Sequence, residues 1–162
     1  MKRVIIFGNS GSGKSTLAKA LCDKNGLAHF DLDTIAWEAS QPPVRKPTDE
    51  STKTIESFVV EHRNWVIEGC YADLLDIVMP HASEIIFLDL PVEVCIANAK
   101  NRPWEPHKYA SKEAQDANLD MLIDWISQYN TRGDEFSHIA HARLFESYNG
   151  KKTLYMDNHE SI

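Results

Sequence analysis

Two groups of residues in this chain have types and spacings suited to phosphate chemistry. The first follows the apolar run Val4–Phe7 and has the spacing G-x-x-x-x-G-K-S. Its glycines let the backbone approach a ligand closely, and its N–H groups, together with the N-terminus of a following helix, form a concave anion site. The pattern predicts a phosphate-binding loop (P-loop) for a nucleoside triphosphate, formed by Gly8, Asn9, Ser10, Gly11, Ser12, Gly13, Lys14, Ser15 and Thr16.

Two side chains of this loop have separate chemical tasks. Lys14 places a point charge beside the β- and γ-phosphates, and the hydroxyl of Ser15 is a ligand for Mg²⁺. We therefore expect ATP and Mg²⁺ as cofactors, with Lys14 among the catalytic residues.

The second group consists of acidic residues that directly follow predicted strands. Asp31 and Asp33 follow one apolar run, and Glu68 follows another. The carboxyl ends of parallel strands meet at one edge of a sheet, so these side chains are expected beside the P-loop as ligands of Mg²⁺ or its waters, together with Ser15. For Asp33 two other interpretations stay open, since it either orients an acceptor hydroxyl or caps the turn that begins at Thr34.

The elements that must position these residues are predicted from apolar periodicity. Strands are expected at 4–7, 27–30, 65–67, 83–89 and 153–156, and they alternate with amphipathic helical patterns. Such alternation predicts the α/β class, with three α/β/α layers around a five-stranded parallel sheet and right-handed crossovers.

Two regions contain stretches without a regular apolar period, and we expect both regions to surround the site. Residues 101–111 predict a short lid over the phosphates, with Arg102 as its best-placed cation. Residues 38–62 predict the acceptor side, where a mobile proline-rich loop (38–47) precedes a helix capped by Thr48. In that loop, Arg45 and Lys46 either contact an anionic group of the acceptor or are solvated charges.

Three further local predictions concern the second half of the chain. A long helix is expected from Ser111, with Met121 in its core-facing stripe. Asp134 is expected to cap the next helix. His138 and His141 on that helix are interpreted as surface residues rather than metal ligands, because no third ligand type is nearby.

Composition limits the possible classes of protein. A chain of 162 residues predicts a single domain covering 1–162. The net charge of −7 argues against a broad nucleic-acid or anionic-membrane surface. Its three widely spaced cysteines predict neither disulfides nor structural zinc, and no apolar run has the length of a signal peptide or membrane span. We expect a cytoplasmic protein, monomeric or weakly dimeric, without nucleic-acid or membrane partners.

Together these motifs resemble the adenylate kinase-like, nucleoside-monophosphate-kinase group of P-loop proteins, with a more distant likeness to shikimate kinase. The P-loop is the strongest match, and the second is the Arg132-Gly133-Asp134-Glu135 stretch followed by Arg143-Leu144. The resemblance implies a P-loop NTPase fold. It also implies that Arg132, Arg143 and Arg102 of the lid neutralise charge on the transferring phosphoryl group.

A second likeness covers the acceptor side. The Asp33…Trp37 stretch and the Trp-Val-Ile-acid-Gly-x-Tyr segment, which here runs from Trp65 to Tyr71, are similar to FlaR-type topology modulation proteins. In adenylate kinase, an arginine after the third strand holds AMP, whereas no arginine stands at 68–72 here. The resemblance therefore implies neither AMP nor shikimate as the acceptor.

Two functions are consistent with these sequence features. One is an ATP- and Mg²⁺-dependent small-molecule kinase that moves the γ-phosphoryl group to a nucleotide or hydroxylated metabolite, with Lys14, Asp33, Arg102, Arg132 and Arg143 as catalytic residues. The alternative is a nucleotide-binding switch without productive transfer, although the chain has no Asn-Lys-x-Asp element of the GTPase type. Simple hydrolysis ranks third, because a lid that excludes water acts against it.

Overall fold

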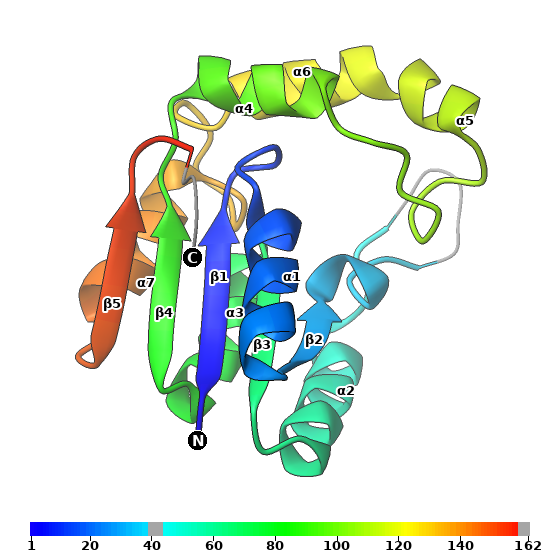
Figure 1. Ribbon diagram of the computed structural model, residues 1–162. Helices are drawn as coiled ribbons and strands as arrows, with labels where there is room; N and C mark the ends of the chain where they lie inside the picture. The colour runs from blue at the N-terminus through cyan, green and yellow to red at the C-terminus, as the bar shows by residue number, and fades with distance from the viewer. Residues whose placement is uncertain (39–43, 159–162) are drawn as a thin grey trace.

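A computed structural model describes residues 1–38 and 44–158, and a five-stranded parallel sheet lies at its centre (Figure 1). The strands are β1 (Arg3–Gly8), β2 (Ala28–Asp31), β3 (Trp65–Gly69), β4 (Glu84–Leu88) and β5 (Lys151–Tyr155). Their order is β2-β3-β1-β4-β5, so β1 pairs with β3 on one side and with β4 on the other. The expected fold class and all five predicted strands are confirmed.

Helices connect the strands and cover the sheet. They are α1 (Lys14–Asn25), α2 (Thr48–Glu61), α3 (Ala72–Val78), α4 (Val92–Lys100), α5 (Lys112–Ala117), α6 (Leu119–Ser127) and α7 (His138–Ser147), with short 3-10 helices at Leu32–Thr34 and Met79–His81. Within the described ranges, no helix has the length and apolar character needed to cross a membrane.

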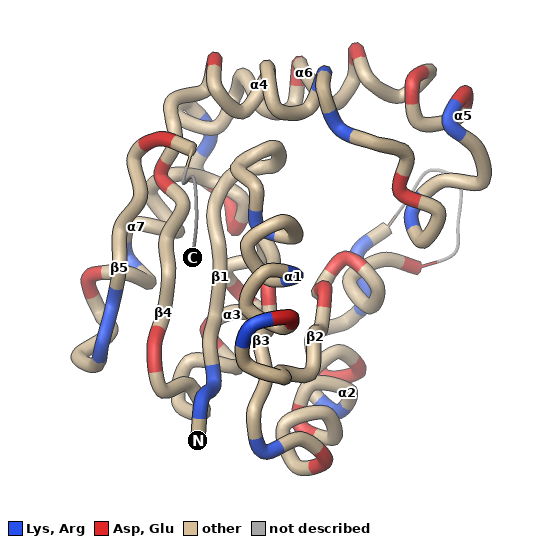
Figure 2. Tube along the Cα trace, in the orientation of Figure 1, with Lys and Arg blue, Asp and Glu red and all other residues tan. Residues whose placement is uncertain are grey.

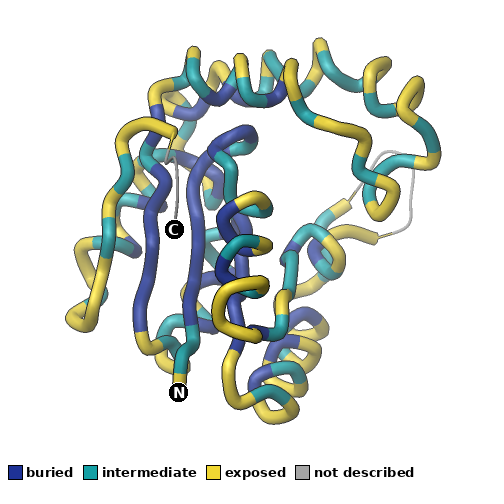
Figure 3. The backbone as a smooth tube through the Cα atoms, viewed as in Figure 1, coloured by how far each residue is buried: buried dark blue, intermediate teal, exposed yellow. Residues whose placement is uncertain are grey.

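The sheet has an apolar core on each of its two faces, and this arrangement makes three layers. Successive side chains of a strand point to opposite faces, so Val4 and Ile6 belong to one core while Ile5 and Phe7 belong to the other. The first core includes buried residues of α1, α4 and α6, and the second those of α2, α3 and α7. In Figure 3 the buried strands β1 and β4 run between more exposed helices.

Two of the predicted helix caps were wrong. Thr48 is the first residue of α2, and Pro47 occupies the N-cap position without a capping side chain. Helix α7 begins only at His138, where the Ser137 hydroxyl accepts from the Ala140 N–H at 3.1 Å. Asp134 instead caps the preceding turn, since its carboxylate accepts from the N–H of Phe136 at 3.0 Å.

The turn after β2 rules out one open interpretation of Asp33, its role as a cap, and the helix predicted from Ser111 differs from expectation. The capping carboxylate of the turn is Asp31, which accepts from the Asp33 N–H at 2.9 Å, so Asp33 is free of that structural task. The long helix is divided into α5 and α6 at Asn118. Met121 is 68% exposed and therefore does not belong to the core.

The surface assignment was wrong for one of the two histidines, His141, whereas the His138 side chain is 36% exposed. His141 is fully buried, with Nε2 2.8 Å from the Cys70 carbonyl and Nδ1 2.7 Å from the Tyr129 hydroxyl. Because a carbonyl can only accept, Nε2 carries the proton and Nδ1 accepts from Tyr129. Burial lowers the pKa of His141 to about 4. His138 forms an ion pair with Asp89 at 3.1 Å, which links the start of α7 to the end of β4.

Candidate functional site

The P-loop joins β1 to α1 and lines a cavity of about 730 Å³ at the carboxyl edge of the sheet. Residues 10–16 contribute to the cavity wall, whereas Gly8 and Asn9 do not. The side chain of Asn9 is buried, and its Nδ2 donates to the Ile126 carbonyl at 3.2 Å. This contact fixes the loop against the helix α6.

The backbone of the loop needs glycine at two points. Gly13 is the N-cap of α1 with φ of 90°, and a Cβ there would meet open space rather than protein. Gly11 has φ of 79°, and a Cβ there would lie 2.3 Å from the Cys95 carbonyl oxygen. Both values lie in the left-handed region, and at Gly11 the close approach of α4 adds a second reason for glycine.

The residues predicted to hold the triphosphate and Mg²⁺ lie together. The Lys14 ammonium donates to the Asn9 carbonyl at 2.8 Å and therefore stays at the loop. The Ser15 hydroxyl donates to the Glu68 carboxylate at 2.8 Å, and the other oxygen of Glu68 lies 2.5 Å from His29 Nε2. This hydrogen bond raises the pKa of His29.

This donor set suits Mg²⁺ bound to a nucleotide. A hydroxyl and one carboxylate are the usual protein contribution to such an ion, while phosphate oxygens and waters complete the octahedron. Within residues 1–38 and 44–158, no group of three His, Cys, Asp or Glu side chains is placed to hold a metal ion alone. Ser15 and Glu68 therefore fit an ion that arrives with the nucleotide.

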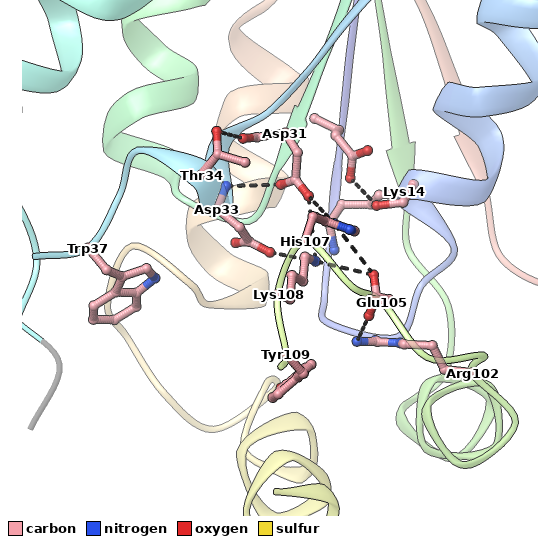
Figure 4. A network of polar contacts seen from close by, with 12 residues as sticks. Lys14, Asp31, Asp33, Thr34, Trp37, Arg102, Glu105, His107, Lys108 and Tyr109 are labelled. Carbon is pink, nitrogen blue, oxygen red and sulfur yellow. Dashed lines mark hydrogen bonds and ion pairs between the residues drawn. The ribbon is translucent and has the colours of Figure 1, made fainter. Parts of the chain in front are cut away.

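The predicted acidic pair faces a lysine of the 101–111 segment (Figure 4). Lys108 Nζ lies 2.8 Å from Asp33, 3.5 Å from Asp31 and 3.6 Å from Glu105. Burial disfavours its ammonium, but the charges of Asp33 and Asp31 outweigh burial and raise the pKa of Lys108. This lysine thus stays charged and links the segment to the end of β2.

The two aspartates of the pair differ in their environment. Burial, followed by repulsion from Asp33, raises the pKa of Asp31. Burial alone would also raise the pKa of Asp33, but the charge of Lys108 and hydrogen bonds from Lys108 and Tyr71 outweigh it and lower the pKa. Of the two, Asp33 therefore has the lower pKa.

Tyr71 fixes the second oxygen of Asp33. Its hydroxyl donates to Asp33 Oδ1, and Trp37 Nε1 donates to the same hydroxyl at 2.8 Å. Burial raises the pKa of Tyr71, so it remains a proton donor in this chain of hydrogen bonds. The arrangement presents a carboxylate in a fixed orientation at the edge of the cavity.

The structure separates the three predicted arginines. Arg102 lines the cavity and pairs with Glu105 at 3.0 Å. Arg132 lies outside it, with its guanidinium 3.4 Å from the centroid of the Trp125 ring and its Nε 3.2 Å from Asp134. Arg143 is exposed on α7 and does not line the cavity either. In this conformation only Arg102 of the three stands beside the P-loop.

The acceptor-side region contains a paired arginine. Arg45 Nη1 lies 2.8 Å from Glu135 and its Nη2 lies 3.1 Å from Asp73, while the guanidinium stands 4.8 Å from the centroid of the Tyr71 ring. The interpretation of Arg45 as a solvated charge is therefore wrong. Residues 39–43 of the predicted mobile loop lie outside the described residues.

Sequence reasoning missed Lys108, Glu105, Tyr71 and His29 as parts of the site. A usable signal existed for Lys108, because a predicted lid carrying a lysine was expected to face an acidic pair, and opposite charges attract. No comparable signal marked Tyr71, whose contact with Asp33 spans 38 positions of the chain.

Comparisons with known proteins agree with the P-loop architecture. A family model described as an AAA domain matches residues 4–119, well over half of the chain. The uncharacterized protein YqaC of Bacillus subtilis is 22% identical over 136 residues, which cover 83% of this chain and 76% of that protein. The nuclear bridge Ish domain protein les1 of Schizosaccharomyces pombe is 28% identical over 135 residues; these cover 82% of this chain but 31% of les1.

Three solved structures also match the chain at low identity. A sugar kinase from Janibacter sp. HTCC2649 is 17% identical with a TM-score of 0.46, and the match covers 78% of this chain and 95% of that chain. A shikimate kinase from Bacteroides thetaiotaomicron is 18% identical with a TM-score of 0.47, and the match covers 90% of this chain and 97% of that chain. A shikimate kinase from Acinetobacter baumannii in complex with shikimate is 18% identical with a TM-score of 0.45, and the match covers 89% of this chain and 91% of that chain. With its P-loop between β1 and α1 and the family match over residues 4–119, the chain belongs to the AAA domain family of P-loop NTPase proteins.

Proposed function

We propose that the protein is an ATP- and Mg²⁺-dependent phosphotransferase, a small-molecule kinase that moves the γ-phosphoryl group of ATP to a hydroxyl of a small acceptor. One observation carries this proposal: Asp31 and Asp33 line the same cavity as Lys14 and Ser15 of the P-loop. A site that only bound a triphosphate would need the loop alone, whereas transfer also needs a polar group that orients the acceptor. We take the whole chain, 1–162, as one such domain, with the 101–111 segment as its lid.

The described residues divide between the two substrates. The P-loop N–H groups and Lys14 would hold the phosphates, and Ser15 with Glu68 would hold Mg²⁺ or its waters. When bound, Mg²⁺ supplies charge neutralisation between the β- and γ-phosphates. Asp33, with Asp31 beside it, would lie on the acceptor side. The difference in partners is the reason for this division, since the Lys108 ammonium contacts both aspartates whereas the Ser15 hydroxyl donates to Glu68.

In the proposed transfer step, each bond that forms or breaks belongs to ATP or the acceptor, and Asp33 takes up the released proton. The acceptor hydroxyl oxygen would bond to the γ-phosphorus, and the bond from that phosphorus to the β,γ-bridging oxygen would break, so that ADP leaves with the electron pair. The hydroxyl proton would pass to the Asp33 carboxylate, whose orientation is fixed by Tyr71.

Arg102 is the first candidate for the cation that neutralises charge on the transferring group, because it already lines the cavity. A guanidinium suits this task through its permanent charge and planar donors. The roles that the resemblance implies for Arg132 and Arg143 would require both side chains to move into the cavity.

Consumption of ATP tests the proposal. The assay would contain Mg²⁺ and a panel of nucleoside monophosphates, nucleosides and small hydroxylated metabolites. We expect one acceptor to raise the rate far above the rate without acceptor, and Lys14→Ala to abolish turnover. Lys53→Ala, at an exposed position of α2, is the matched control and should leave turnover unchanged.

A nucleotide-binding switch is the second candidate. The observation that favours it is the pairing of Arg45 with Asp73 and Glu135, which leaves that arginine occupied rather than available to an anionic acceptor. This function predicts tight ATP binding, a different protease sensitivity of the 101–111 segment with ATP and with ADP, and no stimulation by any acceptor.

A further inference from the structure

Three cations on or beside the acceptor side of the cavity already have carboxylate partners. Arg102 pairs with Glu105 at 3.0 Å. Lys108 contacts the acidic pair and the same Glu105. Arg45 is held by two carboxylates of its own. An acceptor with a phosphate or carboxylate would have to break one of these ion pairs before any of the three cations could bind it.

Several carboxylates share the ammonium of Lys108, and only one of them, Glu105, also pairs with Arg102. Three carboxylates, those of Asp31, Asp33 and Glu105, lie within 3.6 Å of its single ammonium. The Asp31 side chain is only 10% exposed, and its Oδ2 is buried without a hydrogen bond. The nearest basic side-chain nitrogens to this oxygen are 3.5 Å away on Lys108 and 3.7 Å away on the half-exposed His107. The cluster therefore keeps unused capacity for a cation that donates hydrogen bonds.

The Lys108 ammonium and its two aspartate partners belong to different kinds of element. Asp31 and Asp33 belong to the end of β2 and the turn after it, whereas Lys108 belongs to a segment without helix or strand between α4 and α5. Figure 2 shows this segment, with its charged residues, passing opposite the acidic turn after β2. Movement of the segment would vacate the cluster without disturbing the sheet.

We propose, building on the kinase function above, that the acceptor is a small hydroxylated amine. Its ammonium takes the place of Lys108 Nζ between Asp31, Asp33 and Glu105, and its hydroxyl lies between Asp33 and the P-loop. The Lys108 side chain is the internal model for this ligand, because its primary ammonium already makes the contacts that the acceptor would make. Phosphorylated and carboxylated acceptors are rejected by repulsion from the same three carboxylates.

Chemical rescue of a truncated lysine tests the cation site without any turnover. Lys108→Ala removes the ammonium and three methylenes, a volume that propylammonium fills. The readout is chymotrypsin cleavage after Trp104 and Tyr109 in the 101–111 segment. We expect the variant to be cut several-fold faster than wild type, propylammonium to restore protection, and neither propanol nor propionate to do so.

Lys112→Ala is the matched control, because the exposed Lys112 pairs with Asp116 on the surface of α5, at 3.2 Å. Its cleavage rate should equal that of wild type. Unchanged cleavage of Lys108→Ala, no rescue by propylammonium, or equal rescue by propanol would each overturn the cation site.

A charge series then tests the acceptor class in the wild-type protein. Glucosamine, glucose and glucose 6-phosphate form one series, and serinol, glycerol and glycerol 3-phosphate form another. We expect the amine to give the largest stimulation of ATP consumption within a series, and a phosphorylated member that stimulates most would overturn the inference. If no compound stimulates, the kinase function fails, and the rescue experiment still decides the cation site.

Discussion

Asp33 is held through both of its carboxylate oxygens. Tyr71 donates to Oδ1, and the Lys108 ammonium lies 2.8 Å from Oδ2. Both neighbours lower the pKa of Asp33 against the opposing effect of burial. If Asp33 orients the acceptor hydroxyl, the Tyr71 hydroxyl must influence the rate even though it does not touch the substrate.

Tyr71→Phe tests this positioning. The variant removes a hydrogen bond to a charged group, so kcat should fall about 10- to 100-fold, while KM for ATP stays within about twofold. Loss of the donor also raises the pKa of Asp33, so the acid limb of the kcat–pH profile should move to higher pH. Tyr148→Phe is the control, since its hydroxyl donates to the Ala82 carbonyl, at the opposite end of the sheet. A Tyr71→Phe enzyme with wild-type rate and profile would remove Tyr71 from the site.

Substitution of Arg102 and Arg143 tests which arginine neutralises charge on the transferring phosphoryl group. We expect Arg102→Gln to lower kcat by at least tenfold, because Arg102 lines the cavity, and Arg143→Gln to leave it nearly unchanged, because Arg143 is exposed on α7. Steady-state kinetics with a stimulating acceptor would compare the two. The reverse order of effects would mean that α7 approaches the phosphates during turnover, as the resemblance to adenylate kinase implies.

Site residues could be predicted from the sequence where the interacting groups are close together in the chain, and not where they are far apart. The P-loop residues could be identified because their spacing within nine consecutive positions defines the site. Lys108 and Asp33 are far apart in the chain, and only the folded 101–111 segment brings them together. Nothing in the sequence showed that Arg132 stacks on Trp125 instead of facing the cavity.

Among the elements, the strands were predictable and the ends of the helices were less so. β1 and β4 are buried on both faces and therefore appear as continuous apolar runs. Helix ends depend on a few local contacts, and here Pro47 and Ser137 took the positions that the pattern gave to Thr48 and Asp134. Such boundaries vary with the packing of neighbouring elements.

The P-loop as an element depends on its contact with α4. Gly11→Ala would place a methyl group 2.3 Å from the Cys95 carbonyl oxygen at φ of 79°, so the loop must shift. We expect a loss of about 1–3 kcal/mol in the free energy of unfolding and at least tenfold weaker binding of Mg²⁺·ATP. Urea unfolding and calorimetric titration would measure the two effects.

Gly133→Ala is the control for this substitution, because a Cβ at Gly133 meets nothing within 4 Å. It should leave both stability and nucleotide binding close to wild type. Equal behaviour of the two alanine variants would contradict the close approach between the P-loop and α4.

For the whole molecule, His141 connects stability to pH. This buried side chain links Tyr129 to the Cys70 carbonyl behind the sheet and packs edge-on against Phe7. The unfolded histidine titrates near 6.5, and the folded one at about 4. Between these values the unfolded chain binds a proton that the folded chain does not, so stability falls as pH falls, by about 3 kcal/mol in total.

His141→Gln should remove this part of the pH dependence, even if the variant is less stable at pH 7. Urea midpoints at pH 7 and pH 5 for wild type and variant would show the difference. The exposed His81 provides the control, and His81→Gln should keep the wild-type slope. Identical slopes for wild type and His141→Gln would contradict the burial of a neutral histidine.

The destination of the γ-phosphoryl group distinguishes a kinase from a hydrolase and from a nucleotide-binding switch. The protein would be incubated with ATP labelled in the γ-phosphate, Mg²⁺ and the acceptor that most stimulates ATP consumption, and the labelled products would be separated. The kinase account predicts label on the acceptor, in equal amount to the ADP formed, and none there with Lys14→Ala. Label released as inorganic phosphate, or remaining in ATP that is nevertheless tightly bound, would contradict it.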